Sequence, residues 1–473
     1  MSTTVAVLIV YAAVLVALAV WSRRETHTVA GFYLADKKLP FWVVAFSTNA
    51  TGESGWLLLG LSGMGYAVGA QAYWVVAGEF LGIAAAWWFV SRRLKKFSDD
   101  ADAITVPDVL VAKFVDKWNL VRVAAVLIIV LMVTTYVAAQ MVASGKALGD
   151  FLGVEYHTAV VLGAVFIIGY TFIGGYKAVS YTDVVQGVLM LLGLIALPAA
   201  AIIASGGLGE VKLSLQQQDP ALLDVFAFAG KPAWIGVASF IAIGLPFMGV
   251  PQLLVRFMSA RDDGEIRKAR IMSLAVILVF TSGAVTVGVA GRALFPGLDD
   301  PERIFFVLSN NLFPPILAGV LLVVVLSAIM STVDSLLLLS SSAVVRDTYQ
   351  KIMKSDDSEE SLAKYGKILT IAVGLIAVAI GIQEPRQIFD FVLSSWGLLG
   401  SAFGPAVIGI LYYKRITWLG VLCGLLGGFA ASAVWLIVFK TQYYGLYEAI
   451  PGFIVGLLLT FGVSYLSSGK KAA

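Results

Sequence analysis

Long apolar stretches separated by short polar segments run along the whole 473-residue chain. Runs such as Val5–Trp21 and Ile316–Leu326 are continuously apolar and show no alternation of period two. Within a bilayer every backbone polar group must be paired inside the protein, so only helices or a closed barrel can cross. The missing alternation excludes the barrel. The pattern therefore predicts an all-α integral membrane protein of about thirteen transmembrane helices.

Each predicted span is apolar over a length that carries a helix across a hydrocarbon core of ~30 Å. The predicted spans are 3–22, 40–66, 70–91, 120–149, 157–175, 179–204, 233–255, 271–291, 313–345, 364–383, 387–412, 417–438 and 447–467. Cytoplasmic segments are enriched in Lys and Arg. With the N-terminus outside, 26 of the 33 Lys and Arg residues fall on the inner side. We therefore expect a multi-pass protein of the inner cell membrane with its N-terminus outside and its C-terminus cytoplasmic.

Two of the predicted spans are interrupted near their middle by helix-breaking residues, at 49–55 and at 244–251. Each interruption opens a unit of five spans, and because five is odd the second unit has inverted topology. Interrupted helices at matching places in two inverted halves point to the binding site of a transporter. Simple kinks are the alternative, since Gly and Pro are common in membrane helices.

This five-plus-five inverted-repeat core divides the chain into five parts. They are an N-terminal peripheral helix with an inner loop (1–39), a first repeat (40–204), an outer loop (205–232), a second repeat (233–412) and two C-terminal peripheral helices (413–473).

Composition narrows the possible functions. The chain is 59% hydrophobic and 13% charged, with a mean hydropathy of +0.89, whereas soluble domains are about 25% charged. The lipid bilayer is thus an expected partner, and a net charge of only +3 gives no reason to expect nucleic acid. The sequence has no P-loop and no Cys/His metal cluster, and Cys423 is its single cysteine. We expect no enzymatic activity and no cofactor.

Glu53 is the least expected residue, because a carboxylate in the middle of a membrane is costly and usually faces a cavity or a partner. It could pair with a substrate ammonium group, carry a proton, or help to draw in a cation. The alternative is a structural carboxylate that accepts hydrogen bonds from the freed amides of the broken helix. Glu79, in the next span, is more simply a structural residue paired with another polar group.

Hydroxyl groups in the ninth span suggest an ion site. Ser331, Thr332 and Ser335 share one helical face, and a hard cation prefers oxygen ligands. An unwound carbonyl near Ala50 or Glu53 would complete a cage for Na⁺. Hydroxyls that bond back to their own helix are the alternative.

Two carboxylates, Asp183 and Asp334, fall at similar depth in the cytoplasmic half, where they could flank a second cation or its exit path. An interfacial, cap-like role is the alternative for Asp183. In the fourth span, Tyr136 and Gln140 suggest the wall of a polar cavity.

Four stretches of the sequence resemble the sodium/solute symporter family, and within it most closely the sodium/proline symporters. They are Ala-Thr-Gly-Glu-Ser-Gly-Trp at 50–56, Tyr-Thr-Phe-Ile-Gly-Gly-Tyr-Lys-Ala-Val-Ser-Tyr-Thr-Asp-Val-Val-Gln at 170–186, Ala-Ile-Met-Ser-Thr at 328–332 and Ala-Phe-Gly-Pro at 402–405. The resemblance implies the same thirteen-helix inverted-repeat fold. It also implies sodium-coupled symport of a small organic solute, most simply proline or another amino acid, with Na⁺ as the coupling ion. A different solute such as a monocarboxylate, and proton coupling through Glu53, are the alternatives within transport.

The resemblance also implies site residues. A main sodium site falls on Ala50, Glu53, Ala328, Ser331 and Thr332, and a second site, which some members have, falls on Asp183, Asp334 and Ser335. The substrate pattern falls on Ser54, Gly55, Trp56, Tyr136 and Pro251, with Ile243 and Phe247 at positions where proline-type members carry other aromatic residues. The acidic residue that those members carry in the first broken helix falls on Gly52, and the acid here is Glu53.

Overall fold

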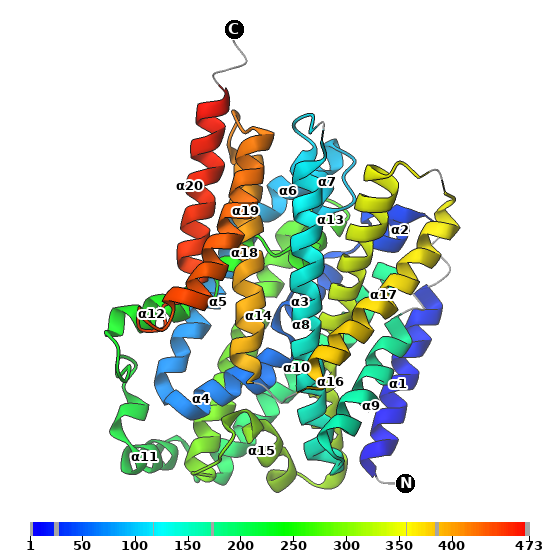
Figure 1. Cartoon of the computed structure of the whole chain (residues 1–473). Coiled ribbons are helices and arrows are strands. Elements are labelled where there is room, and N and C mark those ends of the chain that lie inside the picture. The colour runs from blue at the N-terminus through cyan, green and yellow to red at the C-terminus, as the bar shows by residue number, and fades with distance from the viewer. Residues whose placement is uncertain are drawn as a thin grey trace.

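The computed structural model describes residues 3–22, 28–116, 118–171, 175–355, 357–383 and 387–468. Across these residues the protein is a bundle of helices without strands, apart from a single bridge between Leu39 and Ala260 (Figure 1). The three residues 172–174, at the end of the predicted span 157–175, lie outside the described residues.

The bounds of the α-helices follow the chain. They are α1 (Thr3–Ser22), α2 (Val29–Leu34), α3 (Phe41–Gly55), α4 (Ser62–Val68), α5 (Tyr73–Ala85), α6 (Arg92–Asp100), α7 (Val106–Val111), α8 (Leu120–Leu152), α9 (Tyr156–Thr171), α10 (Gly175–Ala204), α11 (Leu208–Gln218), α12 (Ala233–Ala242), α13 (Pro251–Ser259), α14 (Asp263–Leu294), α15 (Ile304–Leu312), α16 (Pro315–Ser342), α17 (Glu359–Gly381), α18 (Ile388–Tyr412), α19 (Trp418–Val434) and α20 (Ala449–Ser468). Short 3₁₀ or π-helical segments join several of them, at Ala35–Lys37, Trp56–Leu61, Gly69–Ala72, Ala86–Ser91, Pro220–Leu223, Leu245–Met248, Pro301–Arg303, Ala343–Ile352 and Trp435–Phe439.

Ten helical stretches of the described chain are long and apolar enough to cross a membrane, or eleven if the bent pair Ala233–Met248 and Pro251–Ser259 counts as one span. The sequence predicted thirteen. Part of the difference is that Phe41–Asp100 is one nearly continuous helical stretch of 60 residues, where two spans were predicted. The other part is α9, whose apolar portion, Tyr156–Gly169, is shorter than the rest.

The stretch Phe41–Asp100 turns back on itself. At 1.5 Å per residue a straight helix of this length would be ~90 Å long, about three times the hydrocarbon thickness. In Figure 1 the chain descends through α3 to α4 and returns through α5 to α6. The turn lies at Gly69, which has φ of 63°, and a Cβ there would come within 2.2 Å of the Leu222 carbonyl oxygen. A glycine is therefore required at this turn.

Helix α16 lies at the centre of the bundle and other helices shield it from the surroundings. In its apolar window 83% of the residues are buried, against 17% for α1 and 28% for the stretch Trp418–Phe439. It packs against α3, α8 and α10. The polar residues of α16 are thus enclosed by protein on every side, and any ion that reaches them must do so between helices.

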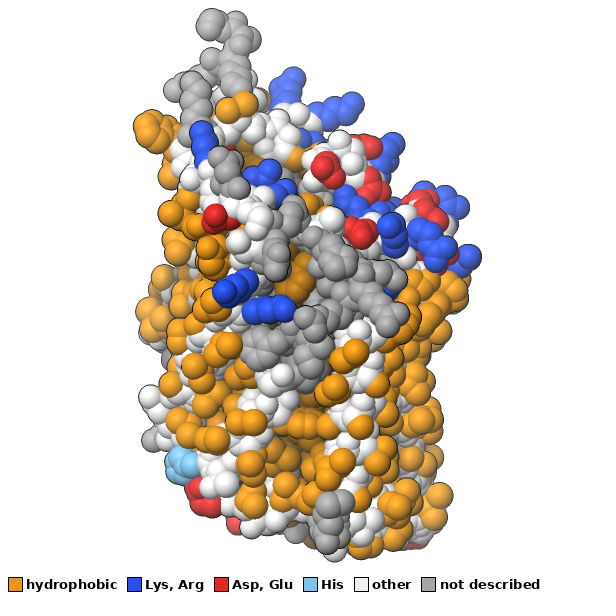
Figure 2. All heavy atoms as spheres, turned by 90° about the vertical axis from the view of Figure 1, so that its right-hand side faces the viewer, with side chains coloured by type: hydrophobic (Ala, Val, Ile, Leu, Met, Phe, Trp, Pro, Cys, Tyr) orange, Lys and Arg blue, Asp and Glu red, His pale blue; other side chains and the backbone are white. Residues whose placement is uncertain are grey.

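The two ends of the bundle differ in charge. On the face drawn in Figure 2, Lys and Arg gather toward the upper end, together with acidic residues, above a broad hydrophobic band. Helix α1 begins at the lower end of the bundle and α20 ends at the upper end (Figure 1). A hydrophobic belt with charged residues toward one end is the surface expected of a protein that sits in a bilayer.

Candidate functional site

The helix α3 is broken at Ser54, within the segment 49–55 where the sequence predicted an interruption. Ser54 has φ of 52° and ψ of −172°, which no helical residue adopts. Side chains accept the freed amides: Gly55 N donates to Gln140 Oε1 at 2.9 Å, and Trp56 N donates to Ser54 Oγ at 3.1 Å. The break is therefore stabilised by the chain itself, and it leaves carbonyl groups of α3 available to neighbouring helices.

Hydroxyls of α16 meet the carbonyls of α3 just before the break. Ser331 Oγ donates to the carbonyl oxygens of Ala50 at 2.8 Å and Ala328 at 3.1 Å. Thr332 Oγ1 donates to the Thr51 carbonyl at 3.0 Å. All of these residues are fully buried. Of the predicted main sodium ligands, Ala50, Ala328 and Ser331 meet directly and Thr332 lies beside them. The carbonyl of Glu53, one turn further along, accepts the Trp56 amide.

The oxygens in this group, which we call the neutral cluster (Ala50, Thr51, Ala328, Ser331 and Thr332), are carbonyl and hydroxyl oxygens without formal charge. Such oxygens are the ligands that hard cations prefer. A cation that entered would replace the three hydroxyl-to-carbonyl hydrogen bonds with direct contacts to the same oxygens. The chemistry of the donor set therefore fits Na⁺.

The carboxyl group of Glu53 is buried beside that of Glu79 in α5. Apart from the neighbouring Glu79 carboxyl group, neither Glu53 oxygen has a hydrogen-bond donor among the described residues. The freed amides, which would have bonded a structural carboxylate, bond Gln140 and Ser54 instead. The polar neighbour that the sequence left unidentified for Glu79 is thus a second acid. Two carboxylates at close range repel each other when both are ionised.

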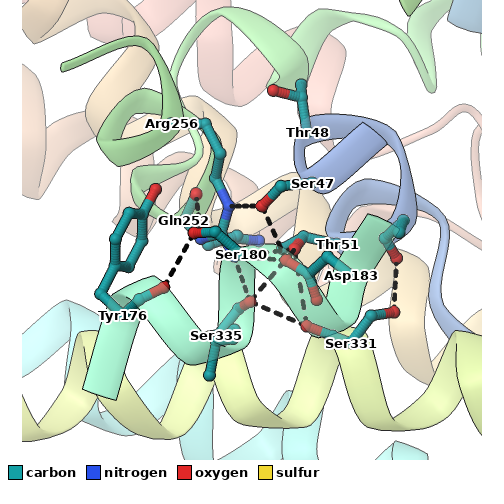
Figure 3. Close-up of polar contacts among 12 residues, drawn as sticks. Ser47, Thr48, Thr51, Tyr176, Ser180, Asp183, Gln252, Arg256, Ser331 and Ser335 are labelled. Carbon is teal, nitrogen blue, oxygen red and sulfur yellow. Dashed lines mark hydrogen bonds and ion pairs between the residues drawn. The ribbon is translucent and has the colours of Figure 1, made fainter. Parts of the chain in front are cut away.

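A second polar group lies one turn along α16, and Arg256 of α13 is at its centre (Figure 3). The Nη2 atom of Arg256 lies 2.8 Å from Thr51 Oγ1 and 3.4 Å from Asp183 Oδ2, and it also contacts Ser335 Oγ. Its Nε donates to Ser47 Oγ at 3.2 Å, and Ser47 Oγ in turn donates to Asp183 Oδ2 at 2.7 Å. We call these five residues the charged cluster.

The remaining bonds of Arg256 fix its side chain in place. Its Nη1 donates to the Gln252 carbonyl one turn earlier at 2.8 Å, and its guanidinium lies 5.2 Å from the centre of the Tyr176 ring. Arg256 is 1% exposed and Asp183 is fully buried. Because an arginine with this many directed bonds has no freedom of rotation, the guanidinium is a fixed component of the cluster.

Sequence reasoning missed Arg256, because it stands at the end of a predicted span and was counted among the basic residues of an inner loop. Two of the three residues predicted for a second sodium site, Asp183 and Ser335, are in the charged cluster. The third, Asp334, is fully buried in the same helix, but consecutive helical residues point in different directions. One sequence feature could have indicated a polar role for Arg256. It lies four residues after Gln252, so the two polar side chains share one helical face.

The predicted substrate residues fall into two groups. Around the break, Tyr136 Oη and Gln140 Nε2 each donate to Ser54 Oγ at 3.4 Å, next to Gly55. Beyond it, Phe247 packs edge-on against Trp396, with ring centres 5.0 Å apart, and Trp396 Nε1 donates to the Ile243 carbonyl at 3.1 Å. Trp396 was not singled out in the sequence.

Gly52 connects these two groups, since a Cβ added there would lie 3.5 Å from Phe247 Cε1. Pro251 is the first residue of α13, the helix that also carries Arg256.

A hollow of about 430 Å³ reaches toward these residues from the loop 219–231. Ile243 and Phe389 line it, and Phe389 stacks on the predicted substrate residue Trp56 with ring centres 5.5 Å apart. On the side of the charged cluster the void next to Arg256 and Tyr176 has a volume of only about 20 Å³. Phe389, which sequence reasoning also missed, thus contacts both the hollow and Trp56.

Comparisons with known proteins agree on one family. The family model described as Sodium:solute symporter family matches residues 32–428. The high-affinity proline transporter PutP of Bacillus subtilis (strain 168) is 34% identical over 455 residues, which are 95% of each chain. A sodium/proline symporter of Staphylococcus aureus is 34% identical over 476 residues, covering 98% of this chain and 92% of that protein.

Solved structures share the fold. A Na⁺-coupled sialic acid symporter, in a substrate-bound outward-open state, superposes with a TM-score of 0.81 at 20% sequence identity, covering 98% of both chains. A nucleobase-cation-symport-1 family transporter superposes with a TM-score of 0.59 at 12% identity, covering 94% of this chain and 96% of that one. At these identities the likeness concerns the fold alone.

Proposed function

Because this chain belongs to the sodium:solute symporter family, and is therefore a multi-pass sodium-coupled symporter and not an enzyme, we propose that its solute is proline or another small amino acid. The relatives named as proline transporters match almost the full length of the chain at 34% identity. The proposed solute site lies at the break of α3, next to Ser54, Gly55, Trp56 and Tyr136. Ile243 and Phe247 form its far wall, and Pro251 is its neighbour on α13.

One observation carries the proposed ion site: a break in α3 whose carbonyls face the hydroxyls of Ser331 and Thr332. We propose that Na⁺ binds in the neutral cluster, with the Glu53 carbonyl as a further ligand. The ion would join α3 to α16, and the solute would bind one turn away at the same break. Binding of either partner would thus order the backbone that the other needs, which is a physical basis for coupling.

The movement of one sodium ion releases enough free energy to drive accumulation of the solute. Inward movement of one Na⁺ releases ~2.3 kcal/mol per 100 mV of membrane potential, and ~1.4 kcal/mol for each tenfold concentration gradient. Together these sustain roughly a 500-fold accumulation of a neutral or zwitterionic solute.

The proposed topology has thirteen spans arranged as two inverted units of five, with α1 and the last two helices peripheral. It counts α3 to α4, α5, α9 and the bent pair α12–α13 as separate crossings. The breaks at Ser54 and at 244–251 occupy the first position of each unit. The end of the bundle where Lys and Arg gather in Figure 2 would be cytoplasmic. The N-terminus would then be outside and the C-terminus inside.

A counterflow screen in proteoliposomes tests this proposal. Purified protein is reconstituted and loaded in turn with proline, other amino acids and small monocarboxylates, each with and without Na⁺. We expect sodium-dependent counterflow with proline or a close amino-acid relative. Counterflow only with monocarboxylates would refute the amino-acid proposal. Uptake that does not depend on Na⁺ and is abolished by an uncoupler would instead indicate proton coupling, for which Glu53 is the candidate carrier.

A further inference from the structure

We propose that the guanidinium of Arg256 is a tethered cation that occupies the second cation site of this transporter, so that the chain binds a single sodium ion. The inference rests on the proposed function only in taking the neutral cluster as the site of that ion. It replaces the second sodium site that the sequence suggested at Asp183, Asp334 and Ser335.

The geometry of one atom carries the inference. Three helices, α3, α10 and α16, each direct one oxygen of the charged cluster toward a common point: Thr51 Oγ1, Asp183 Oδ2 and Ser335 Oγ (Figure 3). A carboxylate with two hydroxyls is a suitable oxygen set for a hard cation. Arg256 Nη2 is in contact with all three oxygens. A terminal nitrogen of the protein thus stands where a second ion would be coordinated.

Charge leads to the same conclusion. The carboxylate of Asp183 is fully buried and needs a positive partner, because an uncompensated charge in a membrane interior is costly. Arg256 supplies it as an ion pair. A sodium ion added to the same oxygens would lie within a few ångströms of the guanidinium, and two cations at that distance repel each other strongly in a medium of low dielectric constant.

The lack of an entry path for an ion also supports the inference. The void beside Arg256, lined by Tyr33, Tyr176 and Gln252, is about 20 Å³, close to the size of one water molecule. The Arg256 side chain is also held from its own helix through the Gln252 carbonyl. The charged cluster is therefore closed, and an ion could enter it only if Arg256 left.

The number of sodium ions bound per chain tests the inference, measured as saturation binding of radioactive sodium to the purified full-length protein. We expect one ion for the wild type and for Arg256→Lys, which keeps the cation. We expect two for Arg256→Gln, because the oxygens of Thr51, Asp183 and Ser335 become available, and one again for Arg256→Gln combined with Asp183→Asn. Two ions in the wild type, or one in a folded Arg256→Gln variant, would overturn the inference.

A second measurement keeps the test decisive if Arg256→Gln does not fold. In a chain that retains Arg256, Ser331→Ala should shift the whole sodium binding curve to about 5- to 30-fold higher concentration, with a single component. A second component that keeps the wild-type affinity and that Asp183→Asn removes would overturn the inference. The ion count does not depend on which solute is carried, so failure of the amino-acid proposal in the counterflow screen is a separate outcome.

Discussion

The neutral cluster and the charged cluster lie one turn apart on α16 and share Thr51 of α3, whose carbonyl belongs to the first and whose hydroxyl belongs to the second. They differ in charge. At Ser331 and Thr332 the oxygens come from carbonyls and hydroxyls, and among the described residues no basic side chain bonds them. At Ser335 the oxygens include the Asp183 carboxylate, and Arg256 is bonded to them. Under the two proposals, hydroxylated sites one turn apart on the same helix hold different cations. The buried carboxylate pairs with a fixed cation of the protein, and the neutral oxygens bind a mobile ion.

The largest expected effect is on the charged cluster. Asp183→Asn leaves the Arg256 guanidinium buried without a counter-charge, which should destabilise the protein by about 3–5 kcal/mol. Thermal unfolding of the detergent-solubilised protein measures the change as a large drop in melting temperature. The double variant Asp183→Asn, Arg256→Gln removes both charges and should recover much of the loss. If Asp183→Asn has the same melting temperature as the wild type, the ion pair does not contribute to stability and the contrast between the clusters disappears.

The next effect concerns Glu53, the acidic residue that follows the neutral cluster in α3. If its charge draws in the cation or pairs with a substrate ammonium group, Glu53→Gln should weaken binding by roughly 1.5–3 kcal/mol, the range for a bond to a charged group. Sodium titrations and solute titrations of uptake show which of the two is affected. Glu79→Gln is the matched control, since it removes the neighbouring acid and leaves Glu53 in place. Near-wild-type uptake and affinities in Glu53→Gln would show that the carboxylate is structural.

A smaller effect is expected within the neutral cluster itself. Ser331→Ala removes one of several neutral ligands, so sodium affinity should fall by about 1–2 kcal/mol, and Thr332→Ala should act in the same direction. The readout is the Na⁺ concentration that gives half-maximal uptake, with expression largely kept. Ser340→Ala, which removes a buried hydroxyl of the same helix outside both clusters, should leave that concentration unchanged. An unchanged sodium dependence in both Ser331→Ala and Thr332→Ala would refute the proposed ion site.

The smallest effect separates the solute from both ion clusters. Phe247→Ala and Tyr136→Ala should each lower solute affinity by about 1 kcal/mol, the typical worth of an aromatic contact. Neither side chain is a good ligand for a hard cation, so sodium binding without solute should change little. Comparing solute titrations with sodium titrations of the same variants provides the test. Equal losses for ion and solute would indicate a general disturbance of the fold.

Much of the fold could be predicted because it follows from local sequence. Apolar run length gave the position of every helix that is long enough to cross a membrane. The break at Ser54 was predicted because glycine and a charged residue interrupt an apolar run there. The number of spans was harder to predict, since Phe41–Asp100 folds as one helical stretch that turns at Gly69.

The geometry of the candidate site could be predicted only where a single helix carries the signal, as at Ser331 and Thr332. Arg256 could not be placed, because its role depends on three other helices meeting its guanidinium. Its sequence neighbours, Val255 and Phe257, suggest nothing more than the end of an apolar span. Phe389 and Trp396 were missed for the same reason: an aromatic residue in a membrane helix is ordinary until its partner across the bundle is known.

The Ala50 carbonyl that accepts the Ser331 hydroxyl has a consequence for how such a protein can evolve. A carbonyl oxygen is present whatever side chain the residue bears, so mutations at ligand positions of this kind alter the ion contact only if they change the path of the backbone. A side chain two residues away, at position 52, can then change without altering that contact. A lineage can in this way exchange one nutrient for another while its dependence on the same inorganic ion is inherited unchanged.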